Sequence, residues 1–220
     1  IEAVTGKTYE AALKELVLDP LGLKMSLFFP NDVMTQRFAV GHIVDNENRV
    51  KVARPWALAR TAHPAGGIAA SARDQIRYAR FHLGDLDPSG FPNPKGLIQQ
   101  MQTPIAQAAL DDQMGLSWFI NDAAGARIVR HGGATLGQLS AFLFAPERGF
   151  AITVLTNGSR GAELHREVTK WALKHYLGAA EPEPAQREMS EAQLKEYAGR
   201  YTTVLADAEL ALENGALVMR

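Results

Sequence analysis

The residues best suited to chemistry lie in one segment, His131-Gly132-Gly133-Ala134-Thr135-Leu136-Gly137. The segment ends one apolar stretch and leads into another. Adjacent glycines leave one edge of a backbone bare, so a ligand can approach the main chain closely. A backbone N–H here could stabilise an oxyanion, and the His131 imidazole could hold a polar or acidic substrate group. The alternative is a glycine-rich hairpin whose histidine is satisfied by the protein itself, and the residues alone leave both open.

No serine of the chain stands in a motif that would make it a nucleophile. The Gly-x-Ser-x-Gly elbow does not occur, and its nearest match, Gly115-Leu116-Ser117-Trp118-Phe119, fails at the last position. No serine is followed three residues later by lysine, so Ser-x-x-Lys, in which the lysine accepts the serine proton, is also absent. The chain has no cysteine, which excludes Cys nucleophiles, thiolate zinc sites and disulfides.

Metal-binding and acid–base patterns are weak. The six histidines are scattered and form no His-Glu-x-x-His pair. We interpret His165-Arg166-Glu167 as the exposed start of a helix. Asp111-Asp112 is interpreted as a solvated turn in preference to a pair of general acid–base carboxylates. The sequence therefore predicts no metal site.

Two glycine-rich stretches are candidates for phosphate-binding loops. Residues 132–137 are followed by a strand pattern, whereas a phosphate loop needs a helix N-terminus after it. Asn157-Gly158-Ser159-Arg160-Gly161 does open a helix, and we interpret it as a plain turn and cap. No cofactor is expected.

The elements that must position the 131–137 segment follow from apolar periodicity and caps. Helices are predicted over 8–18, 71–83, 96–102 and 161–177, with Thr8 and Ser71 as N-caps. Asp19-Pro20-Leu21-Gly22 is expected to end the first helix, because the residue before proline avoids the helical region and Gly22 permits a turn. The last helix is expected to pack through the face that holds Leu164, Val168, Trp171, Ala172 and His175.

Strands are predicted over Met114–Ile120, Arg127–Arg130, Gln138–Phe144 and Phe150–Leu155, with a separate hairpin of 37–44 and 49–54. Short connections favour antiparallel neighbours. Residues 139–144 and 150–155 are apolar at every position but Ser140 and Thr153, which indicates burial on both faces and helices covering the sheet. We expect residues 131–133 at the end of an exposed edge strand bordering a groove, with the two apolar strands deeper in the sheet.

The composition of the chain and the residue patterns at its two ends limit which partners and which kind of segment can be expected. The chain has 220 residues, of which 46% are hydrophobic, and a net charge of −1, so it offers no electrostatic footprint for nucleic acid or an anionic membrane. No apolar run approaches the ~20 residues that span a bilayer. Ile1–Val4 has the pattern of the last turn of a helix, and Leu217–Arg220 that of a strand, so we expect an internal segment of a longer protein. The compartment is not indicated.

Residues 178–189 have the composition of a linker. Beyond it, at 190–220, we predict a capped helix from Ser190 to Tyr197, a strand at 200–205 and a hairpin turning at Asn214-Gly215. About 30 residues cannot bury a core alone. This tail is therefore expected to open a small β-rich C-terminal domain.

Four stretches resemble motif regions of the serine β-lactamase-related family, in the family's order. His131–Gly158 (HGGATLGQLSAFLFAPERGFAITVLTNG) resembles the third motif region. Ile1–Tyr9 (IEAVTGKTY) resembles the segment after the second motif, Asp19–Phe29 (DPLGLKMSLFF) the Pro-Leu-Gly turn, and Pro64–Leu83 (PAGGIAASARDQIRYARFHL) the Gly-Gly segment with its following helix. The family includes class C β-lactamases, penicillin-binding DD-peptidases, D-aminopeptidases and esterases. The resemblance covers residues 1–177, and the tail from Met189 is similar to the small β-domain that often follows.

The resemblance implies a mixed α/β fold of the β-lactamase/transpeptidase type, with an antiparallel sheet flanked by helices and its N-terminal part missing. It implies acyl transfer through the serine of a Ser-x-x-Lys motif, helped by the tyrosine of a Tyr-x-Asn-like motif. Here His131-Gly132-Gly133 matches the third motif and would bind substrate, and the backbone N–H of Ala134 would complete the oxyanion hole. The implied substrate is a small-molecule or peptide-like acyl compound.

Two departures from the family pattern matter. Ser-x-x-Lys and Tyr-x-Asn are absent, but in the family both precede the segment matching Ile1, so this chain alone is expected to be inactive. The third motif begins with His131, whereas a lysine there is a fixed cation that suits a carboxylate better. The sequence thus predicts a segment of a serine hydrolase of esterase, D-peptidase or β-lactamase type. The alternatives are a non-catalytic homologue that serves as a binding module, and an unrelated structural or sugar-binding domain.

Overall fold

The computed structural model describes residues 1–45, 47–88, 90–108, 112–123, 125–179, 188–202 and 207–219. They belong to two compact units, Ile1–Glu181 and Pro182–Arg220. Most of the predicted linker at 178–189 lies outside the described residues, so its boundaries stay a prediction. None of the described helices is both long and apolar enough to cross a membrane.

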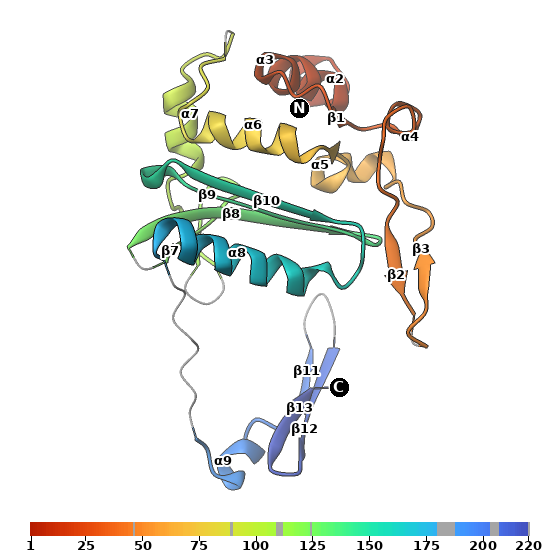
Figure 1. The fold of residues 1–220 in the computed structure, drawn as a ribbon, viewed down its shortest axis with the longest axis vertical. Helices are drawn as coiled ribbons and strands as arrows, with labels where there is room; N and C mark the ends of the chain where they lie inside the picture. The colour runs from red at the N-terminus through yellow and green to blue at the C-terminus, as the bar shows by residue number, and fades with distance from the viewer. Residues whose placement is uncertain are drawn as a thin grey trace. The chain divides into compact units, whose positions relative to one another are not determined.

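The larger unit is built on an antiparallel sheet of six strands in the order β10-β9-β8-β7-β6-β5 (Figure 1). Its strands are β5 Ala106–Gln107, β6 Gln113–Met114, β7 Phe119–Ala123, β8 Ala126–Thr135, β9 Gln138–Ala145 and β10 Phe150–Thr156. The predicted mixed α/β fold, with an antiparallel sheet flanked by helices, is confirmed. The strand predicted at 114–120 is instead divided between β6 and β7, since Ser117 between them has a φ of 64°, which no strand accommodates.

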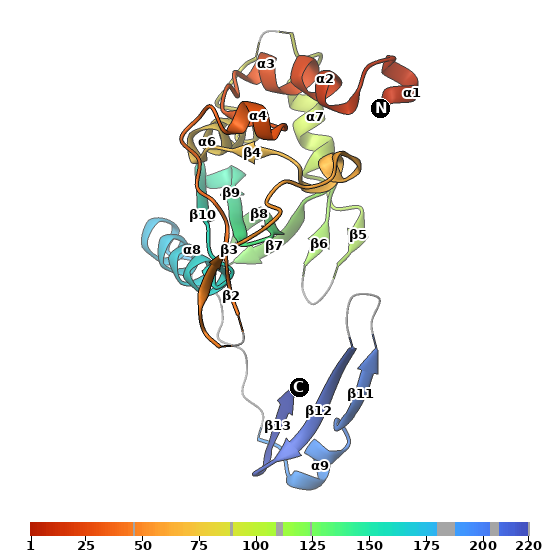
Figure 2. The same ribbon diagram turned by 90° about the vertical axis from the view of Figure 1, so that its right-hand side faces the viewer.

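Helices cover both faces of the sheet, as the two apolar strands require. α6 (Ala72–His82) lies along one face and α8 (Gly161–Leu177) along the other (Figures 1 and 2). Alternate residues of β9 serve the two layers: Phe142 and Phe144 pack with Ala79 of α6, whereas Leu143 packs with Leu173 of α8. A strand that supplies two cores must be apolar on both faces, as β9 is over its buried residues 142–145.

The buried face of α8 agrees with the predicted one only in part, because Ala172 is buried and Val168 half-buried but the larger side chains are exposed. Leu164 is 52% exposed and Trp171 57% exposed. Trp171 stacks on His175 along the outer surface, with ring centroids 4.9 Å apart. The residues that α8 buries are Gly161, His165, Ala172 and Leu173. Gly161 and Ala172 have little or no side chain, so they let the helix pack close to the sheet. This face is therefore buried, and Leu164 and Trp171 lie outward.

The N-terminal helix is less regular than its periodicity predicts. α1 (Glu2–Thr5) precedes α2 (Tyr9–Leu13), a π-helical turn (Lys14–Leu18) and α3 (Asp19–Leu21). The Thr8 hydroxyl accepts a hydrogen bond from the Ala11 N–H, which confirms the predicted N-cap. Asp19-Pro20 does not end the helix, because the wider π turn precedes it and Pro20 occupies the first turn of α3. The chain turns at Gly22 as predicted, since this residue is the C-cap with a φ of 66°.

Short elements join these layers. The predicted hairpin is present as β2 (His42–Val44) paired with β3 (Val50–Val52), and Ser71 caps α6 by accepting from the Asp74 N–H. α7 spans Pro94–Met101. The others are β1 (Ser26–Leu27), which pairs with β4 (Ala69–Ala70), α4 (Pro30–Val33), α5 (His63–Gly66) and 3-10 turns at Arg60–Ala62 and Pro146–Arg148.

The smaller unit holds α9 (Glu191–Lys195) and a sheet of β11 (Gly199–Thr202), β12 (Asp207–Glu213) and β13 (Ala216–Met219). Ser190 and Gln193 form a capping box at α9. Asn214 and Gly215, with φ of 51° and 79°, make the predicted hairpin turn. None of the described residues of this unit is buried, in keeping with the expectation that so short a segment buries no core alone.

Candidate active site

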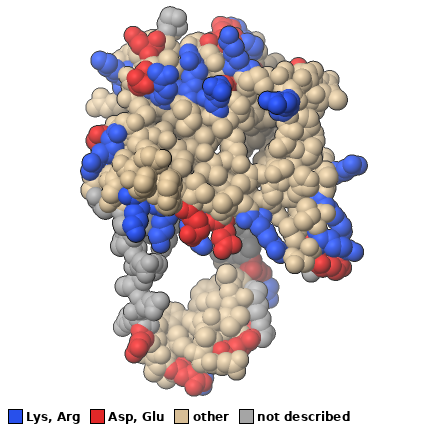
Figure 3. All heavy atoms as spheres, in the orientation of Figure 1, with Lys and Arg blue, Asp and Glu red and all other residues tan. Residues whose placement is uncertain are grey.

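A cavity of about 590 Å³ opens beside β8 in the larger unit. It is lined by segments that are distant in sequence and brought together by the fold. They include parts of 25–39, most of residues 63–71 around α5 and β4, residues 131–135 of β8, residues 138–140 of β9, and residues 155–157 at the end of β10. The space-filling view shows Lys, Arg, Asp and Glu gathered at the upper and lower margins of the larger unit, with few over its middle (Figure 3).

Residues 131–135 of β8 have a strand partner on one side only. β7 pairs with β8 from Ala123 opposite Ala126 to Phe119 opposite Arg130, where that pairing ends. On its other side β8 stays paired with β9 as far as Thr135. The exposed edge predicted at residues 131–133 is therefore confined to this end of β8. β8 as a whole is an inner strand and β10 lies at the sheet margin, because β7 is shorter than β8.

The four site residues predicted from sequence, His131, Gly132, Gly133 and Ala134, all line the cavity. They belong to the strand itself, not to a turn. The His131 side chain is exposed, and its Nδ1 lies 2.6 Å from the Gly132 carbonyl oxygen. Its ring lies 5.9 Å from that of Phe119. Gly133 is paired with Ser140, and a Cβ at Gly133 would lie 2.7 Å from the Ser140 hydroxyl oxygen.

The segment before β2 forms another wall of the cavity. Phe38 packs against Trp56 with ring centroids 5.6 Å apart, and both side chains line the cavity beside Arg37. Asn157, after β10, holds this wall: its side chain donates to the Val40 carbonyl at 3.0 Å, and its carbonyl accepts from the His42 N–H at 2.9 Å.

The Asn157–Gly161 loop does more than the plain turn and cap that the sequence predicts. Arg160 occupies the N-cap position of α8 without a capping side-chain bond. The Ser159 hydroxyl instead accepts from the Val44 N–H at 3.2 Å, and Arg160 donates to the Asn48 side chain at 2.6 Å. The loop therefore fastens the β2–β3 hairpin to the end of the sheet.

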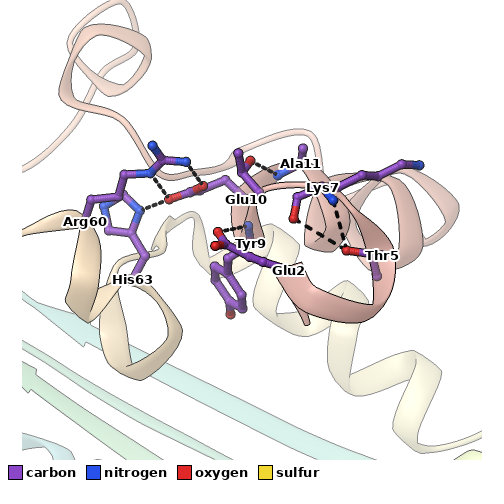
Figure 4. Close-up of polar contacts among 9 residues, drawn as sticks. Glu2, Thr5, Lys7, Tyr9, Glu10, Ala11, Arg60 and His63 are labelled. Atoms are coloured by element: carbon purple, nitrogen blue, oxygen red, sulfur yellow. Dashed lines mark hydrogen bonds and ion pairs between the residues drawn. The ribbon is translucent and has the colours of Figure 1, made fainter.

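An ion-pair cluster of three residues, in which Glu10 and His63 are buried and Arg60 is exposed, holds α5 against α2 (Figure 4). The Glu10 carboxylate, 6% exposed, accepts from Arg60 at 3.0 and 2.9 Å and lies 2.7 Å from His63 Nδ1. Hydrogen bonding from Arg60 lowers the pKa of Glu10 to about 2, against the opposing effect of burial and with help from His63. His63 also lines the cavity, so the cluster fixes part of its wall. Partners separated by 50 and 53 residues leave no local signal in sequence.

The remaining candidates lie outside the cavity. Asp112 is bound by Arg130 at 2.6 Å, and Asp111 lies outside the described residues. His165 is buried, not exposed, and its Nε2 lies 2.9 Å from the Thr156 hydroxyl, because it belongs to the face of α8 that meets the sheet. Burial lowers the pKa of His82 to about 4, but this side chain packs in the core. No group of three or more possible metal ligands occurs in the described part of the chain.

Comparison with known proteins gives a consistent result. A family model described as Beta-lactamase matches residues 1–177. Penicillin-binding protein 4 of Amycolatopsis lactamdurans is 28% identical over 191 residues, which cover 83% of this chain and 50% of that protein. The chain thus spans about half the length of the curated relative that it matches.

Solved structures agree in fold. An octameric penicillin-binding protein homologue from Pyrococcus abyssi superposes with a TM-score of 0.71 at 24% identity, covering 100% of this chain and 49% of that one. A class C beta lactamase from Rhodobacter sphaeroides gives a TM-score of 0.67 at 19% identity, with 80% and 56% covered. At these identities the likeness concerns the fold.

Proposed function

The chain belongs to the β-lactamase family, and from this premise we propose that it forms one wall of a serine hydrolase site. In this proposal the complete protein acts through an acyl-enzyme on an ester, amide or β-lactam-like substrate. The chain contributes the third motif, His131-Gly132-Gly133, and the Ala134 N–H of the oxyanion hole. The nucleophilic serine and its lysine and tyrosine partners come from outside this chain.

The observation that carries the proposal is the half-paired end of β8 at the cavity. In an antiparallel ladder, successive residues point their N–H and C=O groups alternately toward and away from the partner strand. The two-residue turn at Leu136-Gly137 closes on the pair Thr135 and Gln138, so Thr135 faces β9. Ala134, one residue earlier, is then expected to point its N–H away from β9, on the side that β7 does not cover.

The chemistry follows from where charge develops. The serine oxygen bonds to the acyl carbonyl carbon, the serine proton passes to the lysine–tyrosine pair, and the carbonyl oxygen becomes an oxyanion. The Ala134 N–H would donate to that oxygen. Expulsion of the leaving group with a proton gives the acyl-enzyme. Water then gives up a proton and bonds to the acyl carbonyl carbon, and the serine oxygen leaves with a proton as the acid product is released. One such donor is worth roughly 2.7–4 kcal/mol in other acyl-transfer enzymes.

His131 is proposed to position the substrate. Its side chain is exposed at the cavity, whereas the proton transfers are assigned to the lysine and tyrosine outside this chain. Gly132 and Gly133 leave room for substrate against the strand, since neither places a side chain between the backbone and the cavity.

The test is covalent labelling with a fluorophosphonate probe, applied to this chain and to the longer protein that contains it. We expect stoichiometric labelling of one serine in the longer protein and none in this chain. Labelling of a serine within residues 1–220 would contradict the proposal. An unlabelled longer protein would favour the non-catalytic binding module.

The Ala134 assignment has its own test in the longer protein. Ala134→Pro removes the N–H, and we expect a loss of about 10²–10³ in kcat. Ala134→Gly keeps the N–H and is the matched control, expected to retain activity. Equal losses in both variants, or a fall in melting temperature that accounts for the Pro variant, would refute the role of this N–H.

A further inference from the structure

The cavity is almost free of fixed charge, with one exception. Among the described residues that line it, Arg37 is the only Lys, Arg, Asp or Glu. Its guanidinium makes no ion pair or hydrogen bond with any described residue, in contrast to Arg49 and Arg60, which pair with carboxylates. An arginine that the protein leaves unpaired on a cavity wall is available to an anionic ligand, and its planar fork suits a carboxylate.

The surface beside Arg37 is apolar and aromatic. Phe38 and Trp56 pack together on the same wall, and Val33 and Ile68 also line the cavity. Aromatic pairs of this kind bury an apolar side chain well. The neighbouring Ala39 carbonyl accepts a hydrogen bond from the Gln138 side chain, which fixes this wall beside the β8–β9 turn.

We propose that Arg37, Phe38 and Trp56 form a specificity subsite for an apolar group that carries a carboxylate. The inference rests on the proposed function, because the reacting carbonyl would lie at Ala134 while this wall holds another part of the same substrate. It places recognition of the anion on the 36–39 segment and not on His131. The preferred substrates are then N-acylated apolar amino acids or peptides with a free carboxylate near the apolar side chain.

The test compares two probes that differ in one charge. N-acetyl-phenylalanine and its amide are titrated into the full chain, and binding is followed by calorimetry. We expect the carboxylate to bind up to about fivefold more tightly, the range of an exposed ion pair. Arg37→Gln should abolish the preference without weakening amide binding. Arg148→Gln makes the same charge change outside the cavity and should preserve the preference.

Three results would overturn the subsite. These are equal binding of both probes to the wild type, a preference that survives in Arg37→Gln, and binding of neither probe. Failure of the subsite is distinguishable from failure of the proposed function. Serine labelling of the longer protein, with no charge preference, would remove the subsite alone. An unlabelled longer protein would remove the hydrolase proposal, whatever the probes do.

Discussion

A methyl group added at Gly133 tests how closely β8 and β9 approach at the candidate site. Gly133 is paired with Ser140, and a Cβ on Gly133 would lie 2.7 Å from the Ser140 hydroxyl oxygen but 4.0 Å from the Ser140 Cβ. The first distance is a clash and the second an ordinary contact. Gly133→Ala alone should therefore crowd the strand pair, and Ser140→Ala should relieve the crowding.

Two opposing effects determine how much Gly133→Ala changes the free energy of unfolding. Replacing Gly with Ala at a compatible backbone conformation stabilises a protein by about 0.4–1 kcal/mol through the unfolded state. Overpacking costs typically about 1–3 kcal/mol. Because the Ser140 hydroxyl sits on a short side chain that can rotate, we take the lower part of that range. Gly133→Ala is expected to destabilise by roughly 0.5–1 kcal/mol, and the same change in a Ser140→Ala background to stabilise by about 0.5 kcal/mol.

The assay is urea unfolding of the wild type, both single variants and the double variant, read as a double-mutant cycle. The expected coupling is about 1 kcal/mol or more in favour of the double variant. Additive effects, within about 0.3 kcal/mol, would show that the two residues do not constrain one another and would refute the packing argument. In the longer protein, the double variant should still lose activity, because the new methyl group enters the cavity.

Three further predictions concern ionisable side chains. Glu10→Gln should destabilise the chain near neutral pH, because the Glu10 carboxylate, whose pKa is lowered to about 2, stabilises the fold while it is charged. In urea unfolding, the difference in free energy between wild type and variant should therefore shrink as pH falls from about 4.5 toward 2. Burial lowers the pKa of His82 to about 4, so only the unfolded chain takes up its proton between pH 6.5 and 4, and stability should fall by up to about 3 kcal/mol over that range. His82→Phe should remove this slope, and a slope that persists would contradict the assignment. His131→Ala in the longer protein should mainly raise KM, and a pure loss of kcat in steady-state kinetics would instead place His131 in proton transfer.

Local signals in the sequence were sufficient for most elements, and they singled out a segment that lines the cavity. Ser71 predicts the start of α6 because its hydroxyl caps an N–H only three residues away. The largely apolar runs of β9 and β10 predict helices on both faces, and α6 and α8 provide them. The pairing of His131 with glycines next to such a strand placed the candidate site on β8. Each of these features depends on residues within a few positions of one another.

Tertiary structure decided what surrounds that segment. The half-paired edge at residues 131–135 exists because β7 ends opposite Arg130, and strand pairing is not encoded within β8. α8 buries the face that holds Gly161, because the missing side chain there lets the helix approach Thr156 closely. Glu10, Arg60 and His63 meet across 50 residues and more, as do Asn157 and His42. Hydrogen bonds and packing act over a few ångströms in space, so only the folded chain brings these partners within range.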